Sequence, residues 1–132
     1  MALPNGAGGY QLGDGNVGEA QLSIQGAPTL LSGDVTVTAE QLANGLFTVD
    51  SGADITATLP TVALLEAEVS SAEKANSSFD IAVVNIDASY QVTFAVGTGW
   101  TIVGNAIVLE ATSAQFRARK TGVGTWTLYR IA

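Results

Sequence analysis

The side chains best suited to acid–base chemistry lie between Thr61 and Ala75. Glu66 and Glu68 are two positions apart, so on a helix they diverge by roughly 200° and cannot share one site. Glu66 and Glu73 fall on one face of such a helix, which we interpret as its solvated side. A carboxylate pair of the kind that cleaves glycosides is therefore not expected.

Nucleophilic catalysis would also lack a base in this chain. The sequence contains no histidine and no cysteine, which removes the commonest general base and any thiolate site. No Ser-x-x-Lys motif occurs, and Lys74 and Lys120 fall at the ends of a predicted helix and a predicted strand, where solvation is expected. We predict a protein that is not an enzyme and that uses no cofactor or metal.

The glycine-rich turns do not complete a ligand-binding motif. The turn at 97–99 leads into another predicted strand, whereas a nucleotide-binding loop needs a helix there, and the turn at 122–124 is typical of a hairpin. The segment 14–19 resembles the start of a calcium loop, but Gln25 stands where the terminal Glu is required.

Four aromatic residues could bind a carbohydrate if they are exposed. They are Trp100, Trp126, Tyr90 and Tyr129. Aromatic residues in alternating strands more often pack in a core, which is the interpretation that we favour here.

Charge and composition narrow the class of protein further. The chain has 132 residues, enough for one domain, and a formal charge of −7. Residues 1–73 contain no Lys or Arg, and a chain this acidic lacks the positive surface that nucleic-acid binding needs. There is neither a secretory signal nor an apolar run long enough to cross a membrane, so we expect a soluble product made in the cytoplasm.

The first 33 residues differ from the rest. They hold more than half of the fifteen glycines, with apolar residues dotted between them. Such a segment is costly to order alone. We predict an extended arm over 1–33 that is ordered by a partner, with Leu3, Tyr10 and Leu12 as anchors, followed by a single β-rich domain over 34–132.

From Asp34 onward the pattern is that of an all-β fold. Apolar and polar residues alternate at 34–38, 54–59, 91–96 and 126–131, which indicates strands. Residues 79–86 are apolar on both faces, as in a central strand covered on both sides. Many short strands separated by tight turns suggest a β-sandwich, jelly roll or small barrel.

Helical spacing breaks this alternation twice. Val62, Leu65, Val69 and Ala72 recur at spacings of three and four after Thr61, which predicts one amphipathic helix over 61–75. A weaker helical turn is predicted at 39–43, before Asn44-Gly45. No internal repeat or long helical shaft is evident.

The carboxy-terminal half resembles small structural proteins of tailed bacteriophages, in particular capsid decoration (cement) proteins. The resemblance is carried by structural motifs at 79–86, 92–100, 102–105, 116–122 and 125–130, with Gly13–Asn16 and Leu59–Thr61 also fitting. It implies a β-rich homotrimer on the capsid surface of the virion that clamps neighbouring major capsid protein subunits. We further expect Arg117 and Arg119 to face carboxylates of a neighbouring copy.

The sequence also leaves a second class of function open. A trimeric head- or tail-fibre module could bind a host surface glycan through grooves between its subunits. The absence of evident repeats favours decoration, and the number of copies per virion would separate the two.

Overall fold

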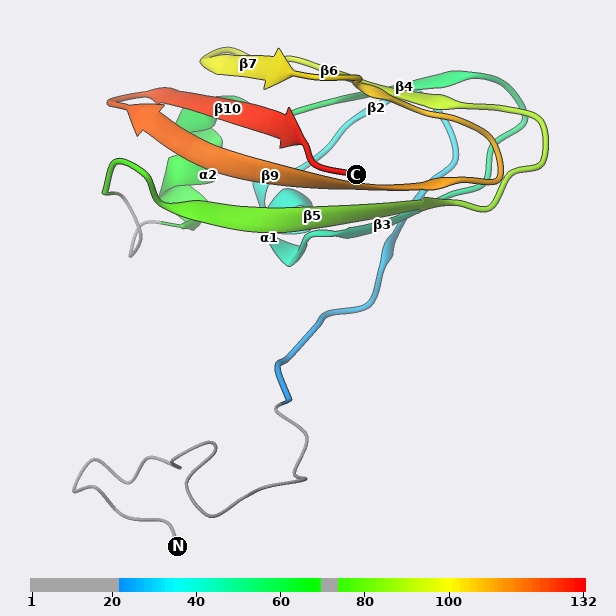
Figure 1. Cartoon of the computed structure of the whole chain (residues 1–132), viewed down its shortest axis with the longest axis horizontal. Coiled ribbons are helices and arrows are strands. Elements are labelled where there is room, and N and C mark those ends of the chain that lie inside the picture. The colour runs from blue at the N-terminus through cyan, green and yellow to red at the C-terminus, as the bar shows by residue number, and fades with distance from the viewer. Residues whose placement is uncertain (1–21, 70–73) are drawn as a thin grey trace, which may run out of the picture.

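The structure is a computed structural model that describes residues 22–69 and 74–132 (Figure 1). Strands dominate this part of the chain and only two short helices accompany them, which confirms a largely β fold. The strands are β1 Thr29–Leu31, β2 Val35–Thr36, β3 Leu46–Val49, β4 Ile55–Thr58, β5 Ser78–Asn85, β6 Val92–Ala95, β7 Trp100–Val103, β8 Ile107–Val108, β9 Ser113–Gly122 and β10 Thr125–Arg130. The helices are α1 Ala39–Asn44 and α2 Val62–Glu68.

The strands form two sheets. One has six strands in the order β1-β3-β5-β9-β10-β7, and the other has four in the order β2-β4-β6-β8. Both helices lie behind the six-stranded sheet in Figure 1. The apolar core is therefore enclosed by the inward faces of the two sheets and by the helices.

A structural repeat that the sequence did not reveal organises the first half of the fold. One unit is β1-β2-α1 and the next is β3-β4-α2, and each unit adds a parallel strand to both sheets. The aligned positions are Thr29, Phe47 and Val83 in one sheet and Val35, Ala57 and Phe94 in the other. These parallel ladders differ from the antiparallel order of a jelly roll.

Two aspartates serve the same purpose in successive units. Asp34 Oδ1 accepts a hydrogen bond from Thr56 N at 2.8 Å, and Asp54 Oδ1 accepts one from Gln91 N at 3.1 Å. Each carboxylate thus satisfies a backbone donor of the strand that follows in the stack, within β4 for Asp34 and just before the start of β6 for Asp54.

The helices begin at threonine caps. Thr38 forms a capping box with Gln41, and Thr61 Oγ1 accepts a hydrogen bond from Leu64 N. The helical turn predicted at 39–43 is confirmed. The helix predicted over 61–75 is wrong in length: α2 ends at Glu68, and the backbone of Val69, with φ −106° and ψ 34°, is no longer helical. Residues 70–73 of the predicted helix lie outside the described residues.

Aromatic rings join the two sheets. The ring centroids of Phe47 and Phe94 are 6.4 Å apart, and those of Phe94 and Phe116 are 5.4 Å apart. Trp100 and Trp126 pack against each other and are 6% and 1% exposed. Both tryptophans therefore belong to the core, as the alternation predicted, and neither presents a ring to a sugar.

Strand β5 is central, between β3 and β9, but it is not covered on both sides. Val84 is 39% exposed and Ile86, just after the strand, is 60% exposed. This corrects the sequence prediction, and the reason is that both helices lie on the inward side of the sheet. The outward face of the six-stranded sheet is open in the described part of the chain.

The boundary predicted at residue 33 falls after the first strand. Residues 29–31 form β1 and pair with β3, so the end of the predicted arm already belongs to the sheet. Residues 22–28, in contrast, have no regular secondary structure and are exposed.

Candidate docking surfaces

A largely buried ion pair holds one side of helix α2. Lys120 Nζ lies 2.9 Å from Glu66 Oε2, and the Trp126 indole donates a hydrogen bond to the same oxygen at 3.1 Å. The side chains of Lys120 and Glu66 are only 8% and 18% exposed. Sequence reasoning expected both to be solvated, and the structure corrects this.

The pKa of Glu66 lies below its ordinary value. The main cause is the hydrogen bond from Lys120, with smaller contributions from the Trp126 indole and the charge of Lys120, while burial acts in the opposite direction. A carboxylate held ionised and paired is a poor proton acceptor, so this cluster is structural. One sequence signal could have revealed it: Lys120 continues the inward alternation of Ala118 and Phe116 along β9.

A second internal carboxylate holds the turn after β5. Asp87 accepts hydrogen bonds from the backbone N–H groups of Ser89, Ser51 and Tyr90 at 2.8–3.0 Å. These bonds, that of Ser89 first, place the pKa of Asp87 below its ordinary value. In the described residues, no buried side-chain nitrogen or oxygen lacks a partner. The interior is therefore satisfied without a ligand.

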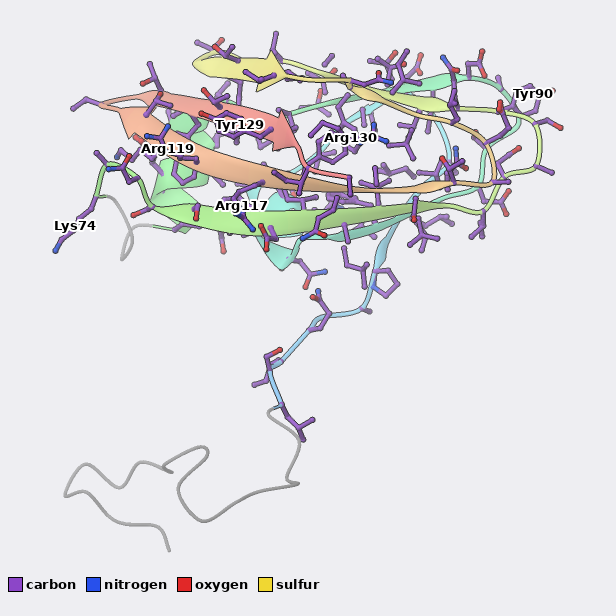
Figure 2. All side chains as sticks on the ribbon, in the orientation of Figure 1. Lys74, Tyr90, Arg117, Arg119, Tyr129 and Arg130 are labelled. Atoms are coloured by element: carbon purple, nitrogen blue, oxygen red, sulfur yellow. The ribbon has the colours of Figure 1, made fainter. Side chains whose placement is uncertain are left out.

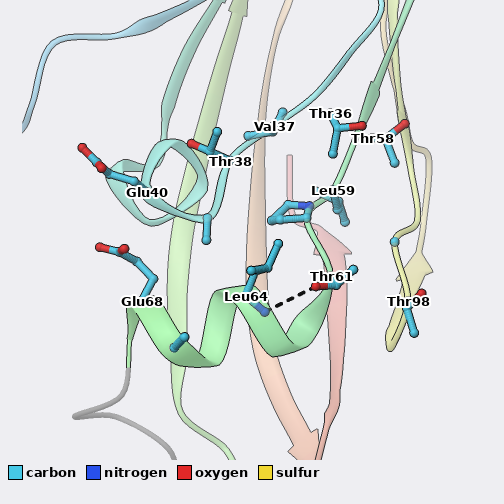
Figure 3. Close-up of a pocket in the computed structure, with 14 residues that line it drawn as sticks. Thr36, Val37, Thr38, Glu40, Thr58, Leu59, Thr61, Leu64, Glu68 and Thr98 are labelled. Carbon is cyan, nitrogen blue, oxygen red and sulfur yellow. Dashed lines mark hydrogen bonds between the residues drawn. The ribbon is translucent and has the colours of Figure 1, made fainter.

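A groove lies between the two helices (Figure 3). Its volume is about 700 Å³, and mostly apolar groups line it. Leu64 points into it from α2 and is 59% exposed. One wall is held rigid because the Trp100 indole donates a hydrogen bond to Pro60 O at 2.8 Å. We call this hollow the helix groove; its lining is Thr36, Val37, Thr38, Ala39, Glu40, Thr58, Leu59, Pro60, Thr61, Leu64, Ala67, Glu68, Gly97 and Thr98.

Two carboxylates stand on the rim of the helix groove. Glu40 projects from α1 and Glu68 from α2, on the same side of the groove in Figure 3, and both are exposed. Neither takes part in an ion pair within the described residues, where the pairs are Arg117–Asp80 and Lys120–Glu66. The groove therefore combines an apolar floor with a negative rim.

Residues 22–28, which we call the arm root, project from the body (Figure 1). Leu22 is 87% exposed and Ile24 is fully exposed. Asn44 at the end of α1 anchors the base of the arm root: Gln25 Nε2 donates to Asn44 O at 2.8 Å, and Asn44 Nδ2 donates to Ala27 O at 3.0 Å. Two large apolar side chains are thus held out in solvent.

The predicted site residues are placed only in part. Leu3, Tyr10 and Leu12 lie outside the described residues. Arg117 and Arg119 lie on the outward face of the six-stranded sheet, and Figure 2 shows them along β9.

The two arginines have partners within the chain. Arg117 Nε lies 2.8 Å from Asp80 Oδ1, and this contact raises the pKa of Arg117. Arg119 donates to Asn76 Oδ1 at 2.6 Å and to the hydroxyl of Tyr129 at 3.2 Å, both neutral groups. A contact with carboxylates of another copy stays a prediction for both.

Comparison with known proteins found no match to a protein-family model, a curated protein or a solved structure. Within residues 22–69 and 74–132, no helix is long and apolar enough to span a membrane. In the same residues, no three His, Cys, Asp or Glu side chains come together in a way that could hold a metal ion.

Proposed function

We propose that this chain is a structural protein of a phage virion, a capsid decoration protein that binds the assembled head lattice as a homotrimer. The arm root carries this proposal, because a body that holds Leu22 and Ile24 out in solvent is suited to contact another subunit of an assembly. A subunit that binds only the assembled lattice stabilises it by mass action.

The body has the properties of a rigid support. Its two sheets pack through Phe47, Phe94 and Phe116, an arrangement that we interpret as β-sandwich-like. Since its buried polar side chains are satisfied internally, docking would not need to reorganise the body. The ordering cost then falls on the glycine-rich arm, whose apolar residues Leu3, Tyr10 and Leu12 would anchor it on the major capsid protein.

The open sheet face suits the proposed trimer. Val84 and Ile86 are exposed there, and Arg117 and Arg119 lie further along the same sheet. Exposed apolar groups next to charged ones are typical of interaction surfaces. Replacing both arginines by Glu should convert the trimer to monomer in light scattering, and a trimer that survives would contradict this interface.

Removal of residues 2–16 tests the docking role. The truncated chain should fail to sediment with capsids that bind the full chain, because it lacks the proposed anchors. Its far-ultraviolet circular dichroism should still report the folded β body. Full occupancy of the capsid by the truncated chain would contradict the role of the arm.

A further inference from the structure

The apolar end of the arm root and the helix groove are complementary surfaces. The base of the arm root, at Gly26 and Ala27, lies beside the rim carboxylates Glu40 and Glu68, but Leu22 and Ile24 are not covered within the chain. The arm root exposes Leu22 and Ile24, while the helix groove leaves Leu64 59% exposed. The hydrogen bonds of Asn44 hold the base of the arm root, which then runs away from its own body in Figure 1. Each surface leaves apolar area in water that the other could cover.

We infer that the arm root of one copy lies in the helix groove of a second copy, with Leu22 and Ile24 against Leu64 and Pro60. This site goes beyond the proposed function and rests on one part of it, the association of copies. It gives that association a specific contact, one that differs from the sheet face that carries Arg117.

Shape supports this occupant. Side chains two positions apart on an extended chain point to the same side and lie about 7 Å apart, so Leu22 and Ile24 can enter one groove together. The groove volume of about 700 Å³ suits a short extended segment. Its lining includes Thr36, Thr58 and Thr98, residue types whose hydroxyl groups can hydrogen-bond to the backbone of an extended segment.

Charge favours the arm root over other parts of this acidic chain. Glu40 and Glu68 would repel a segment that carries carboxylates, as Leu109 with its neighbour Glu110 would. Residues 22–28 contain no charged side chain, so they can pass between the two carboxylates without repulsion.

The position of the arm root in the chain agrees with this contact. The residues before Leu22, including Leu3, Tyr10 and Leu12, would continue past the neighbouring copy and stay free to reach a further partner. A projection on one copy that enters a hollow on the next forms a head-to-tail contact, which closes into a ring when the rotation between copies allows it.

The test uses a pair of introduced cysteines, because the chain has none of its own. We would combine I24C with L64C in one full-length chain and oxidise it gently. A disulfide needs Cα atoms within about 7 Å, so it reports direct contact. If the arm root reaches a second copy, a non-reducing gel shows covalent dimers and larger species. V123C with L64C is the matched control, since Val123 is also almost fully exposed, at 99%, and it should link far more slowly.

Three other results of the cross-linking test would each overturn the inference. A fast-migrating monomer with a disulfide within one chain would mean that the arm root folds back onto its own groove. A non-covalent oligomer that forms no links above the control would refute the contact and leave the proposed trimer standing. A chain that stays monomeric at all concentrations would refute the contact and the proposed trimer together.

An independent measurement uses the affinity of self-association. I24D should weaken the affinity of self-association about tenfold or more in analytical ultracentrifugation, because the substitution puts a carboxylate in place of an apolar anchor. V123D adds the same charge at an equally exposed position and should leave the affinity of self-association unchanged. Equal effects of the two substitutions would overturn the inference.

Discussion

The two sides of helix α2 differ in how completely they are covered. On the inward side, Leu65 is fully buried, and Glu66 is paired with Lys120 and accepts a hydrogen bond from the Trp126 indole. On the outward side, Leu64 is largely exposed, and Glu68 has no ion pair within the described residues. A carboxylate thus lies inside while a leucine lies outside.

This inversion separates groups that stabilise the fold from groups that are available for binding. Glu66 can be buried because Lys120 and Trp126 satisfy it, whereas burial without them would be costly. Leu64 gains little in the isolated chain, since more than half of it remains in water. We therefore assign the inward side to stability and the outward side to docking.

Substitution of adjacent leucines should give the largest difference. L65A should destabilise the fold by about 2–5 kcal/mol, because it leaves a cavity in the core. L64A should change the free energy of unfolding by less than about 0.5 kcal/mol, because its side chain is exposed. Urea unfolding measures both, under conditions in which the protein is monomeric. Similar losses for the two would contradict the assignment of sides.

The two glutamates give a second comparison on the same helix. E66A should cost about 2–3 kcal/mol, at or below the lower end for a buried pair, because Lys120 loses its partner but Glu66 retains some exposure. E68A should be nearly neutral. The double variant E66L with K120M should recover part of the loss, since an apolar pair leaves no buried charge. If the loss in this double variant equals the sum of the losses in E66L and K120M made singly, the ion pair contributes no coupling.

Acid should weaken the fold through its two internally bonded carboxylates, Glu66 and Asp87. The pKa values of Glu66 and Asp87 lie below their ordinary values of 4.5 and 3.8. Carboxylates with lowered folded-state pKa values give their full stabilisation above the unfolded-state values and lose it as the pH falls through the folded-state values. The urea midpoint should therefore be constant above about pH 6 and should fall below about pH 4.5. E66Q should reduce this fall, and an unchanged acid response would show that Glu66 does not contribute to it.

The surface pair should contribute much less to stability than the Glu66–Lys120 pair. Arg117 and Asp80 are about half exposed, at 48% and 50%, so water and salt screen their attraction. R117A should shift the urea midpoint less than E66A does, and added salt should reduce the difference from the unsubstituted chain. A loss as large as that of E66A would place Arg117 among the groups that hold the fold together.

Local features of the fold were predictable from the sequence. Thr61 and the spacing of Val62 and Leu65 correctly predicted the start of α2, and alternation placed Trp100 and Trp126 in the core. The parallel repeat was missed because strand pairing joins distant residues, such as Phe47 with Val83, and no local pattern encodes it. The Glu66–Lys120 pair was missed in part for the same reason: alternation along β9 indicates that Lys120 faces inward, but its partner is far away in the chain.

The candidate site was less predictable than the fold. An apolar arm could be inferred from residues dotted among glycines, but the helix groove depends on how α1 and α2 lie relative to each other. Leu64 breaks the pattern of apolar residues that face the core, and this is the local signal that the sequence offered.

Cryo-electron microscopy of the virion that carries this protein tests the central claim most directly. The proposal predicts density for three copies at each local threefold position of the head, with their arms running over the capsid shell. Density confined to the tail or to scattered projections would contradict the decoration role and would favour a receptor-binding module.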